Sequence, residues 1–388
     1  MIGELHPVAQ EILKRHFNIV DVIDVCHYGQ HPNILLSRLS NAKKEVYEPN
    51  DRIILILGDH DYYLNGEGPG FQLYNVQLAL SHLGIPNYFC LLITSQSNYD
   101  DYTKMVQRQL TVDDIHIRSI TTMLDTSLSC KVSPRKDNAD QIEKAYCILS
   151  RQARSHRAYF LSKIFAANIQ DFGVIGYNNL HYPPSDEIDP NDQDLENQDI
   201  GFLSQPTHLP PLLLHNKEDR QIFSEFTKRC PNYKNFIEQS DMLDNSIISS
   251  LDSINPIQQA LIYVGLETQH TLRKPFMSRI SLRGVIEKRP FIILGVPGIL
   301  ARLRSEGFET FSNFWDESYD SETDLISRTN MIISILEKWS SMSIDSLRSA
   351  YDGMRDVIEH NHDYYHHGYI NHQSLKLEQA CRDNLQGS

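Results

Sequence analysis

Short apolar runs that alternate with helix-like stretches are the feature that most constrains the fold of this chain. Between the first two runs, residues 70–83 carry apolar side chains at helical spacing, and Gly84 followed by Pro86 provides a helix stop. Strands that alternate with helices predict an α/β fold, in which a parallel sheet carries helices on its faces. Four runs of strand length lie in the first 150 residues, at 53–57, 88–94, 115–120 and 146–149.

The same alternation continues through the rest of the chain, whose 388 residues suit two domains because single cores seldom grow past roughly 250–300 residues. We expect a first domain over 1–145, a second over 146–345, and a C-terminal helix with a polar, His-rich tail over 346–388. Residues 183–205 form an acidic loop, either an exposed linker or an ordered metal site. Further elements are expected as helices at 7–17, 155–168, 298–305, 325–339 and 346–359, and as strands at 174–177, 260–264 and 290–294.

Charge, hydropathy and cysteine content disfavour several classes of protein. The formal net charge of -14 disfavours wrapping of duplex DNA, because that binding relies on Lys and Arg that neutralise phosphates. No apolar run reaches the ~18–20 residues that span a bilayer, and the N-terminal residues show no export signal. The six cysteines are scattered without a CxxC pair, which predicts a reducing, cytoplasmic location and no four-Cys zinc site.

A basic segment stands out in this acidic chain. From Arg273 to Arg304 there are eight basic residues and one acid, Glu287. A strand, the tight turn Gly295–Gly298 and a helix N-terminus place backbone N–H groups at the carboxyl edge of a sheet, where ligands of open α/β sheets bind. Arg279 and Arg283 lie on one face if their stretch is helical, and an anionic diphosphate would suit them. The alternative is a solvated basic helix beside an ordinary strand–turn–helix.

The order of motifs in the second half resembles a family of glycosyltransferase-like proteins of large tailed phages, especially marine phages and cyanophages. That family is distantly similar to the donor-binding domain of α1,3-fucosyltransferases. The resemblance covers roughly residues 145–365. The residues that carry it are Glu267, Thr268, Phe276, Ser278, 290–295, Gly307, Phe308, Thr310, Phe311 and 315–320, and, upstream, 146–150 with Arg154, Ser155, His156 and Arg157.

The resemblance implies two Rossmann-like domains that face each other across a cleft, the GT-B fold. It also implies transfer of a sugar from a nucleoside-diphosphate sugar to a hydroxyl, with no metal or other cofactor required. The acceptor would be a modified nucleic acid, a glycan or a small molecule, and the location the cytoplasm of the host cell. The donor-binding residues implied are Arg154, His156, Arg157, Glu267, Ser278, Arg279, Ser281, Arg283, Gly295, Pro297 and Gly298.

One departure from the family pattern supports an alternative function. Where the family reads Ser-Glu-Lys-Thr, this chain has Ser278-Arg279-Ile280-Ser281, and the Glu and Lys are associated with the donor nucleotide in fucosyltransferases. Their loss removes a ribose acceptor and a phosphate cation. The alternative is therefore a degenerate, non-catalytic relative that acts as a structural or host-interaction component of the phage.

Inverting transfer also needs a general base, and Asp59, His60 and Asp61 at the end of the first predicted strand are the candidates. Two other interpretations of these residues are a polar strand exit and a D-x-D metal site. Three further features also stay open. The first is the group Arg154, His156 and Arg157, which either contacts phosphate or only begins a helix. The second is the segment 315–320, which either holds a sugar or packs the domain. The third is the set of tail histidines around His360 and His362, which either bind a metal or form a polar helix end.

Overall fold

The computed structural model contains two compact units, each assembled from separate stretches of the chain. The first unit comprises residues 1–130, 273–279 and 366–388, and the second comprises 131–272 and 280–365. The expected domain limits at 145 and 345 stay predictions. The structure describes residues 7–16, 19–24, 52–58, 90–94, 118–121, 139–150, 154–178, 214–229, 232–234, 256–267, 270 and 277–386.

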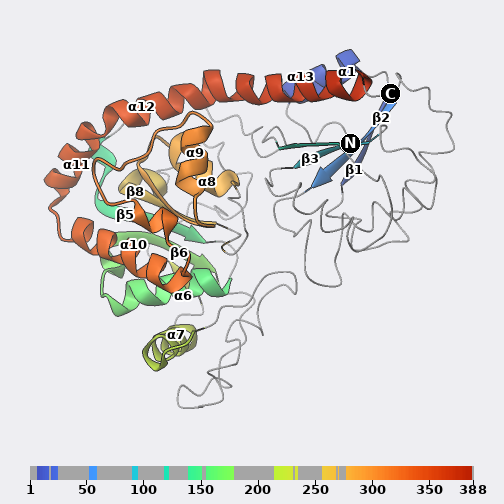
Figure 1. The fold of residues 1–388 in the computed structure, drawn as a ribbon. Helices are drawn as coiled ribbons and strands as arrows, with labels where there is room; N and C mark the ends of the chain where they lie inside the picture. The colour runs from blue at the N-terminus through green and yellow to red at the C-terminus, as the bar shows by residue number, and fades with distance from the viewer. Residues whose placement is uncertain are drawn as a thin grey trace. The chain divides into compact units, whose positions relative to one another are not determined.

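The first unit contains a four-stranded parallel sheet in the order β1-β2-β3-β4. Figure 1 labels β1, β2 and β3 of this sheet. Three of its strands confirm the strand predictions, with shifts of up to three residues at their ends. β1 was not expected from the sequence, and the predicted helix at 70–83 lies outside the described residues. The strands are β1 (Ile19–Asp24), β2 (Arg52–Gly58), β3 (Cys90–Thr94) and β4 (Arg118–Thr121).

Two helices from opposite ends of the sequence pack together in this unit. α1 (Pro7–His16) confirms the predicted N-terminal helix, and its Pro7 occupies the first helical position, where a missing N–H is harmless. α13 (Ile370–Gln386) lies against α1. His16 Nε2 lies 2.6 Å from Glu378 Oε1, and this contact, with Arg15 nearby, lowers the pKa of Glu378.

The second unit contains a five-stranded sheet in the order β7-β6-β5-β8-β9, in which only β7 is antiparallel to its neighbour. The strands predicted at 146–149, 174–177, 260–264 and 290–294 are confirmed. Every residue of β8 is buried, as its continuous apolar sequence requires of a strand covered on both faces. The strands are β5 (Lys144–Ser150), β6 (Gly173–Asn178), β7 (Asn232–Lys234), β8 (Ala260–Leu266) and β9 (Phe291–Leu294).

Helices surround this second sheet, and α10 lies against β5, β9 and α6. The helices predicted at 155–168, 298–305 and 325–339 are confirmed as α6, α9 and α10. The helices of the unit are α6 (Ser155–Ala166), α7 (Lys217–Arg229), α8 (Arg279–Ile286), α9 (Ile299–Ser305), α10 (Leu325–Ser340), α11 (Ile344–Gly353) and α12 (Arg355–Asp363). Short 3-10 turns occur at Ala139–Gln141, Gln170–Phe172, Pro256–Gln259 and Ser318–Ser321.

The prediction of one helix over 346–359 was wrong, because two helices meet at Met354. The backbone N–H of Met354 donates to the carbonyls of Ala350 and Tyr351, and its fully buried side chain anchors the junction in the core. Gly353, the last residue of α11, favours a break because glycine is a poor helix former. Beyond α12, a π-helical turn (Tyr364–Tyr369) leads into α13, and the limit between the two units falls inside this turn.

The α/β fold class is therefore confirmed. Among the helices that the structure describes, none combines the length and the apolar character needed to cross a bilayer.

Candidate functional site: a buried cationic cluster

The order of the second sheet defines where a ligand would bind. From β5 the chain proceeds to β6 on one side of β5, and it later returns to form β8 on the other side. The segments that follow β5 and β8 therefore diverge at the carboxyl edge of the sheet. Such a switch point is where open α/β sheets bind their ligands.

Five basic side chains gather at this switch point and all are buried. Arg154, His156 and Arg157 come from the start of α6, directly after β5. His270 lies four residues beyond the end of β8, and Arg328 belongs to α10. Arg328 is only 1% exposed, although arginine is rarely buried without a partner. The cluster brings together segments up to 174 residues apart in the sequence.

The two histidines of the cluster contact each other directly. Their rings stack with centroids 4.2 Å apart and an interplanar angle of 30°. His156 Nε2 donates to the backbone carbonyl of Glu267 at 2.8 Å, because a carbonyl can only accept. In the neutral ring, Nδ1 of His156 then carries a lone pair. Within the described part of the chain, neither His156 Nδ1 nor His270 Nδ1 has a hydrogen-bond partner.

Both histidines are held in the neutral state. Burial, followed by the charges of Arg328, Arg154 and Arg157, lowers the pKa of His270 to about 3. Burial and the neighbouring His270 and Arg157 likewise hold the pKa of His156 well below its usual range, against the opposing hydrogen bond to Glu267. A protonated ring would add a further positive charge to a buried group of cations.

Arg328 carries donors that the described residues leave unsatisfied. Its Nη2 donates to the backbone carbonyl of His270 at 3.3 Å, whereas its buried Nε and Nη1 find no acceptor among those residues. Burial lowers the pKa of Arg328 to about 10, although Asp320 and Asp324 act in the opposite direction. Arg328 therefore stays charged near neutral pH. Buried donors are almost always satisfied, so an acceptor-rich group such as a phosphate suits this position.

Glu267 connects the site to α8 and to His156. Its carboxylate accepts from the backbone N–H of Ser281 at 3.0 Å and from the Ser281 hydroxyl. A carboxylate in contact with the first turn of α8 caps that helix and satisfies its unpaired amides. Glu267 therefore ties the end of β8 to α8, while its carbonyl orients His156. Its role in donor binding stays a prediction.

The remaining predicted residues of α8 have different surroundings. Ser278 is buried immediately before the helix. Arg283 is half-buried, and its Nε has no hydrogen-bond partner among the described residues. The side chain of Arg279 lies outside the described residues.

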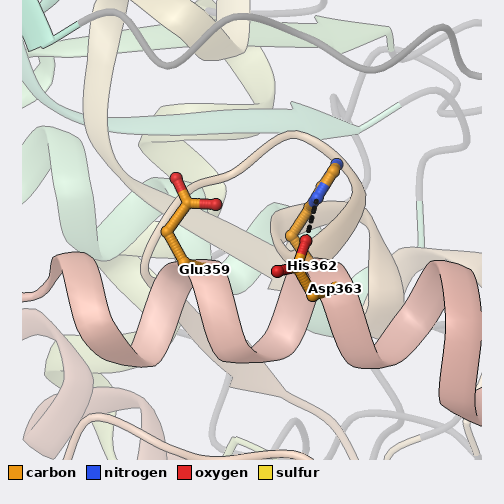
Figure 2. Close-up of side chains that lie close together, drawn as sticks. All are labelled: Glu359, His362 and Asp363. Atoms are coloured by element: carbon orange, nitrogen blue, oxygen red, sulfur yellow. Dashed lines mark ion pairs between the residues drawn. The ribbon is translucent and has the colours of Figure 1, made fainter.

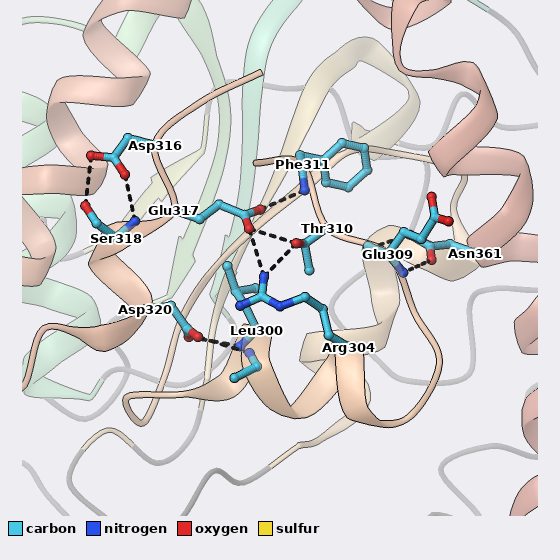
Figure 3. A network of polar contacts seen from close by, with 11 residues as sticks. Leu300, Arg304, Glu309, Thr310, Phe311, Asp316, Glu317, Ser318, Asp320 and Asn361 are labelled. Atoms are coloured by element: carbon cyan, nitrogen blue, oxygen red, sulfur yellow. Dashed lines mark hydrogen bonds and ion pairs between the residues drawn. The ribbon is translucent and has the colours of Figure 1, made fainter. Parts of the chain in front are cut away.

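The turn before α9 is occupied by a side chain of the protein itself. The carboxylate of Asp320 accepts from the backbone N–H groups of Leu300 at 2.9 Å and Ala301 at 3.1 Å (Figure 3). The carbonyl of Asp320 accepts from the N–H of Gly298 at 2.7 Å. Gly295 lies so close to Glu267 that an added Cβ would be 3.2 Å from the Glu267 Cβ. The amide of Gly298 at the end of the expected phosphate turn, and two amides at the start of α9, are thus already bonded to Asp320.

Four other basic residues of the basic segment serve local structure. Lys288 pairs with Glu359 at 2.7 Å, and Arg304 pairs with Glu317 at 3.0 Å. Arg302 pairs with Glu306 one helical turn away. Arg289 donates to backbone carbonyls and lies over the ring of Tyr351, 4.9 Å from its centroid. The cationic site of this unit is therefore built mainly from other parts of the sequence.

Residues 315–320 pack and cap the unit, so the geometry supports the structural interpretation of this motif. Glu317 accepts from the Thr310 hydroxyl and from the Phe311 N–H, each at 2.7 Å (Figure 3). Trp315 stacks on Phe311 and meets Trp339 edge-on.

A group on α12 has the composition of a metal site. Potential ligand atoms of Glu359, His362 and Asp363 lie within 4.8 Å of one another (Figure 2). However, Glu359 already forms an ion pair with Lys288, and His362 Nδ1 lies 3.7 Å from Asp363. A metal ion would have to compete with Lys288 for Glu359. His360, another tail histidine, stacks on Tyr364 and contacts the carbonyl of Gly307.

The three candidate catalytic residues follow the last residue of β2, Gly58. Asp59, His60 and Asp61 lie outside the described residues, so their role stays a prediction.

Comparison with known proteins gives no match. No protein-family model, no curated protein and no solved structure is significantly similar to the chain.

Two residues of the cluster were missed in the sequence. His270 lies in a stretch without recognisable periodicity. Arg328 did carry a signal, because it precedes Ile332 and Leu336 at intervals of four residues and so falls on the apolar face of α10. A charged residue on the buried face of a helix is unusual and marks a candidate binding residue.

Proposed function

We propose that the second unit binds a phosphate-bearing ligand at the switch point of its sheet, and that the protein is a glycosyltransferase which uses a nucleoside-diphosphate sugar as donor. The observation that carries the proposal is the buried cluster of three arginines and two neutral, stacked histidines. Buried cations held close together repel one another, and a bound anion would reduce that repulsion.

The chemistry of the cluster favours a phosphate over a single carboxylate. Guanidinium groups form paired hydrogen bonds with phosphate oxygens, and Arg328 has two nitrogens, Nε and Nη1, without an acceptor in the described part of the chain. Three guanidinium charges match the negative charges of a diphosphate better than the one charge of a carboxylate. The position at the carboxyl edge of the sheet is also the one at which this kind of fold binds nucleotides.

In sugar transfer, negative charge develops on the diphosphate as its bond to the sugar breaks. Arg154, Arg157 and Arg328 would stabilise that charge in a buried site from which water is excluded. The acceptor hydroxyl would lose its proton to a general base, for which Asp59, His60 and Asp61 remain the candidates. We further propose the GT-B arrangement of two Rossmann-like domains that the family resemblance implies.

Ligand-induced stabilisation tests the binding step. A panel of pyrophosphate, UDP, GDP and nucleotide sugars would be titrated while the melting temperature of the full chain is followed. A ligand at 100 times its Kd stabilises the folded state by about 2.7 kcal/mol, a shift of several degrees. We expect Arg328→Gln to lose this shift and Arg355→Gln, a change at a half-exposed arginine of α12, to retain it. A melting temperature of the unmodified protein that no ligand raises would contradict the proposal.

A second candidate is a non-catalytic relative that serves a structural or host-interaction role. The motif Arg279-Ile280 in place of Glu-Lys and the amides already bonded to Asp320 favour it. Turnover separates the two functions. Release of nucleoside diphosphate from the donor that binds, abolished by alanine at Asp59 or His60, would support the enzyme. Binding without turnover in the presence of nucleic-acid and glycan acceptors would support the alternative.

A further inference from the structure

We propose that His270 is a further ligand-binding residue of this site, and that it contacts the anionic group of the ligand as an imidazolium, after taking up a proton from solvent. The inference rests on the proposed anion site, and it adds His270 as a residue that contacts the anion and one proton that His270 takes up on binding. The only bond change is one protonation: as the anion enters, a ring nitrogen takes a proton from a buffer acid, and the conjugate base of that acid stays in the solvent.

The position of the His270 ring suits contact with a ligand. His270 is 3% exposed and stacks on His156 at 4.2 Å, so both rings are fixed in place. Its backbone carbonyl accepts from Arg328, which holds the guanidinium beside it. The buried Nδ1 of His270 finds no hydrogen-bond partner in the part of the chain that the structure describes. A buried ring nitrogen left bare is rare and marks a place where a ligand can bind.

The charged groups around the His270 ring oppose its protonation in the ligand-free protein. Arg154 and Arg157 act on His270 from the start of α6, Arg328 acts from α10, and all three are cations. The stacked His156 is neutral. Among the described acids of this region, Glu267 caps α8, while Asp320, Asp324 and Glu322 act on Arg328 of the cluster; none of these acids is among the groups that shift the pKa of His270. The surroundings of His270 in the ligand-free protein therefore oppose a proton.

An anion reverses this balance. An opposite charge within about 4–6 Å changes a pKa by roughly 1–3, and a doubly charged group supplies two such charges. The pKa of His270, about 3 in the ligand-free site, would then rise toward neutrality. Across the interval between the two values, ligand binding takes up one proton. Affinity should therefore fall roughly tenfold for each unit that the pH rises, and it should become constant above the pKa of the complex.

Sulfate is the probe for this test, because it stays a dianion from about pH 5 to about 9 and any pH dependence then comes from the protein. Isothermal titration of the full chain in buffers with different ionisation enthalpies counts the protons taken up. We expect an uptake close to one proton near pH 6, lost in His270→Gln, which binds sulfate more weakly but with little pH dependence. His360→Gln, a change at an exposed histidine of α12, should keep the uptake.

Two results would overturn the inference while the proposed function stands. One is sulfate binding with no proton uptake, and the other is an uptake that His270→Gln leaves intact. The Cε1–H resonance of His270 in the unmodified protein gives a second readout that needs no variant. It should move to the imidazolium position on saturation with sulfate, and an unmoved resonance would exclude the proposal. Failure of both sulfate and pyrophosphate to bind would instead contradict the anion site itself.

Discussion

His156 and His270 stack with their ring centroids 4.2 Å apart, within a group that also contains three buried arginines. The contact joins the start of α6 to the segment after β8, across the point at which the chain changes direction in the sheet. Without a bound anion, a proton on either of these buried imidazoles would destabilise the folded state, because guanidinium groups surround both rings. This relationship links the stability of the second unit to pH and to ligands.

Mild acid should destabilise the ligand-free second unit, because His270 is neutral in the folded protein but takes up a proton when the protein unfolds. An unfolded histidine has a pKa of about 6.5, whereas burial and neighbouring arginines lower the pKa of folded His270 to about 3. A lowered folded pKa contributes stability that is complete above the unfolded value. This contribution is lost as the pH falls from about 6.5 towards about 3.

The measurement is urea unfolding at several pH values between about 7.5 and 4.5, with His270→Gln as comparison. We expect the unmodified protein to lose on the order of a few kcal/mol over this range, and the variant to lose clearly less. Equal pH dependence of the two proteins would mean that His270 is not the titrating group.

Removal of the charge of Arg328 should separate stability from binding. Replacement of a buried charge by an apolar side chain of similar length is often neutral or stabilising, so Arg328→Met should leave the ligand-free protein as stable or up to about 2 kcal/mol more stable. The same change should weaken anion binding about 100-fold, because it removes a buried charged donor. Arg355→Met, on exposed α12 surface, should change neither quantity. A strongly destabilised Arg328→Met protein would assign Arg328 a structural role.

Glu267 should stabilise the second unit through its contact with α8. Glu267→Ala leaves the buried N–H of Ser281 without its acceptor, which should lower the free energy of unfolding by about 1–3 kcal/mol. Glu337→Ala, at an exposed position of α10, is the matched control and should stay within about 0.5 kcal/mol of the unmodified protein. Chemical denaturation of both variants at pH 7.5 decides the matter, and equal stabilities would refute the capping role.

Two glycines should respond in opposite directions to the same substitution. Gly307 has a φ of +100°, and an added Cβ would lie 2.7 Å from the hydroxyl of Tyr364, so Gly307→Ala should destabilise the unit by at least about 1 kcal/mol. Gly353 ends α11 with its nearest neighbour 3.9 Å from an added Cβ. Gly353→Ala should therefore stabilise by about 0.5–1 kcal/mol. Thermal unfolding of the two variants provides the comparison, and a shift in the same direction would contradict it.

Local sequence alone predicted most of the described strands and helices. Strand-length apolar runs became β2, β3, β5, β6, β8 and β9, and the spacing of apolar residues predicted α6 and α10. These elements depend on periodicities of a few residues, which a sequence displays directly. The break at Met354 was not predicted, since the helical pattern continues across it; in the structure Gly353 ends α11 and the side chain of Met354 is buried.

The candidate site was predicted only in part. Arg154, His156 and Arg157 were identified from the sequence, because they follow a predicted strand and the expected family resemblance includes them. The turn at 295–298 and the helix N-terminus after it were expected to bind phosphate, but tertiary structure brings Asp320 to the amides of Gly298, Leu300 and Ala301.

The sequence by itself determined the class of fold, most of the described strands, though not β1 or β7, and three of the five residues of the cationic cluster. Only the tertiary structure decided that His270 and Arg328 complete that cluster, 114 and 172 residues beyond His156. The reason is that residue spacing encodes local conformation. Which distant side chains share a buried space depends on strand order and helix packing, and neither is visible in any short stretch of residues.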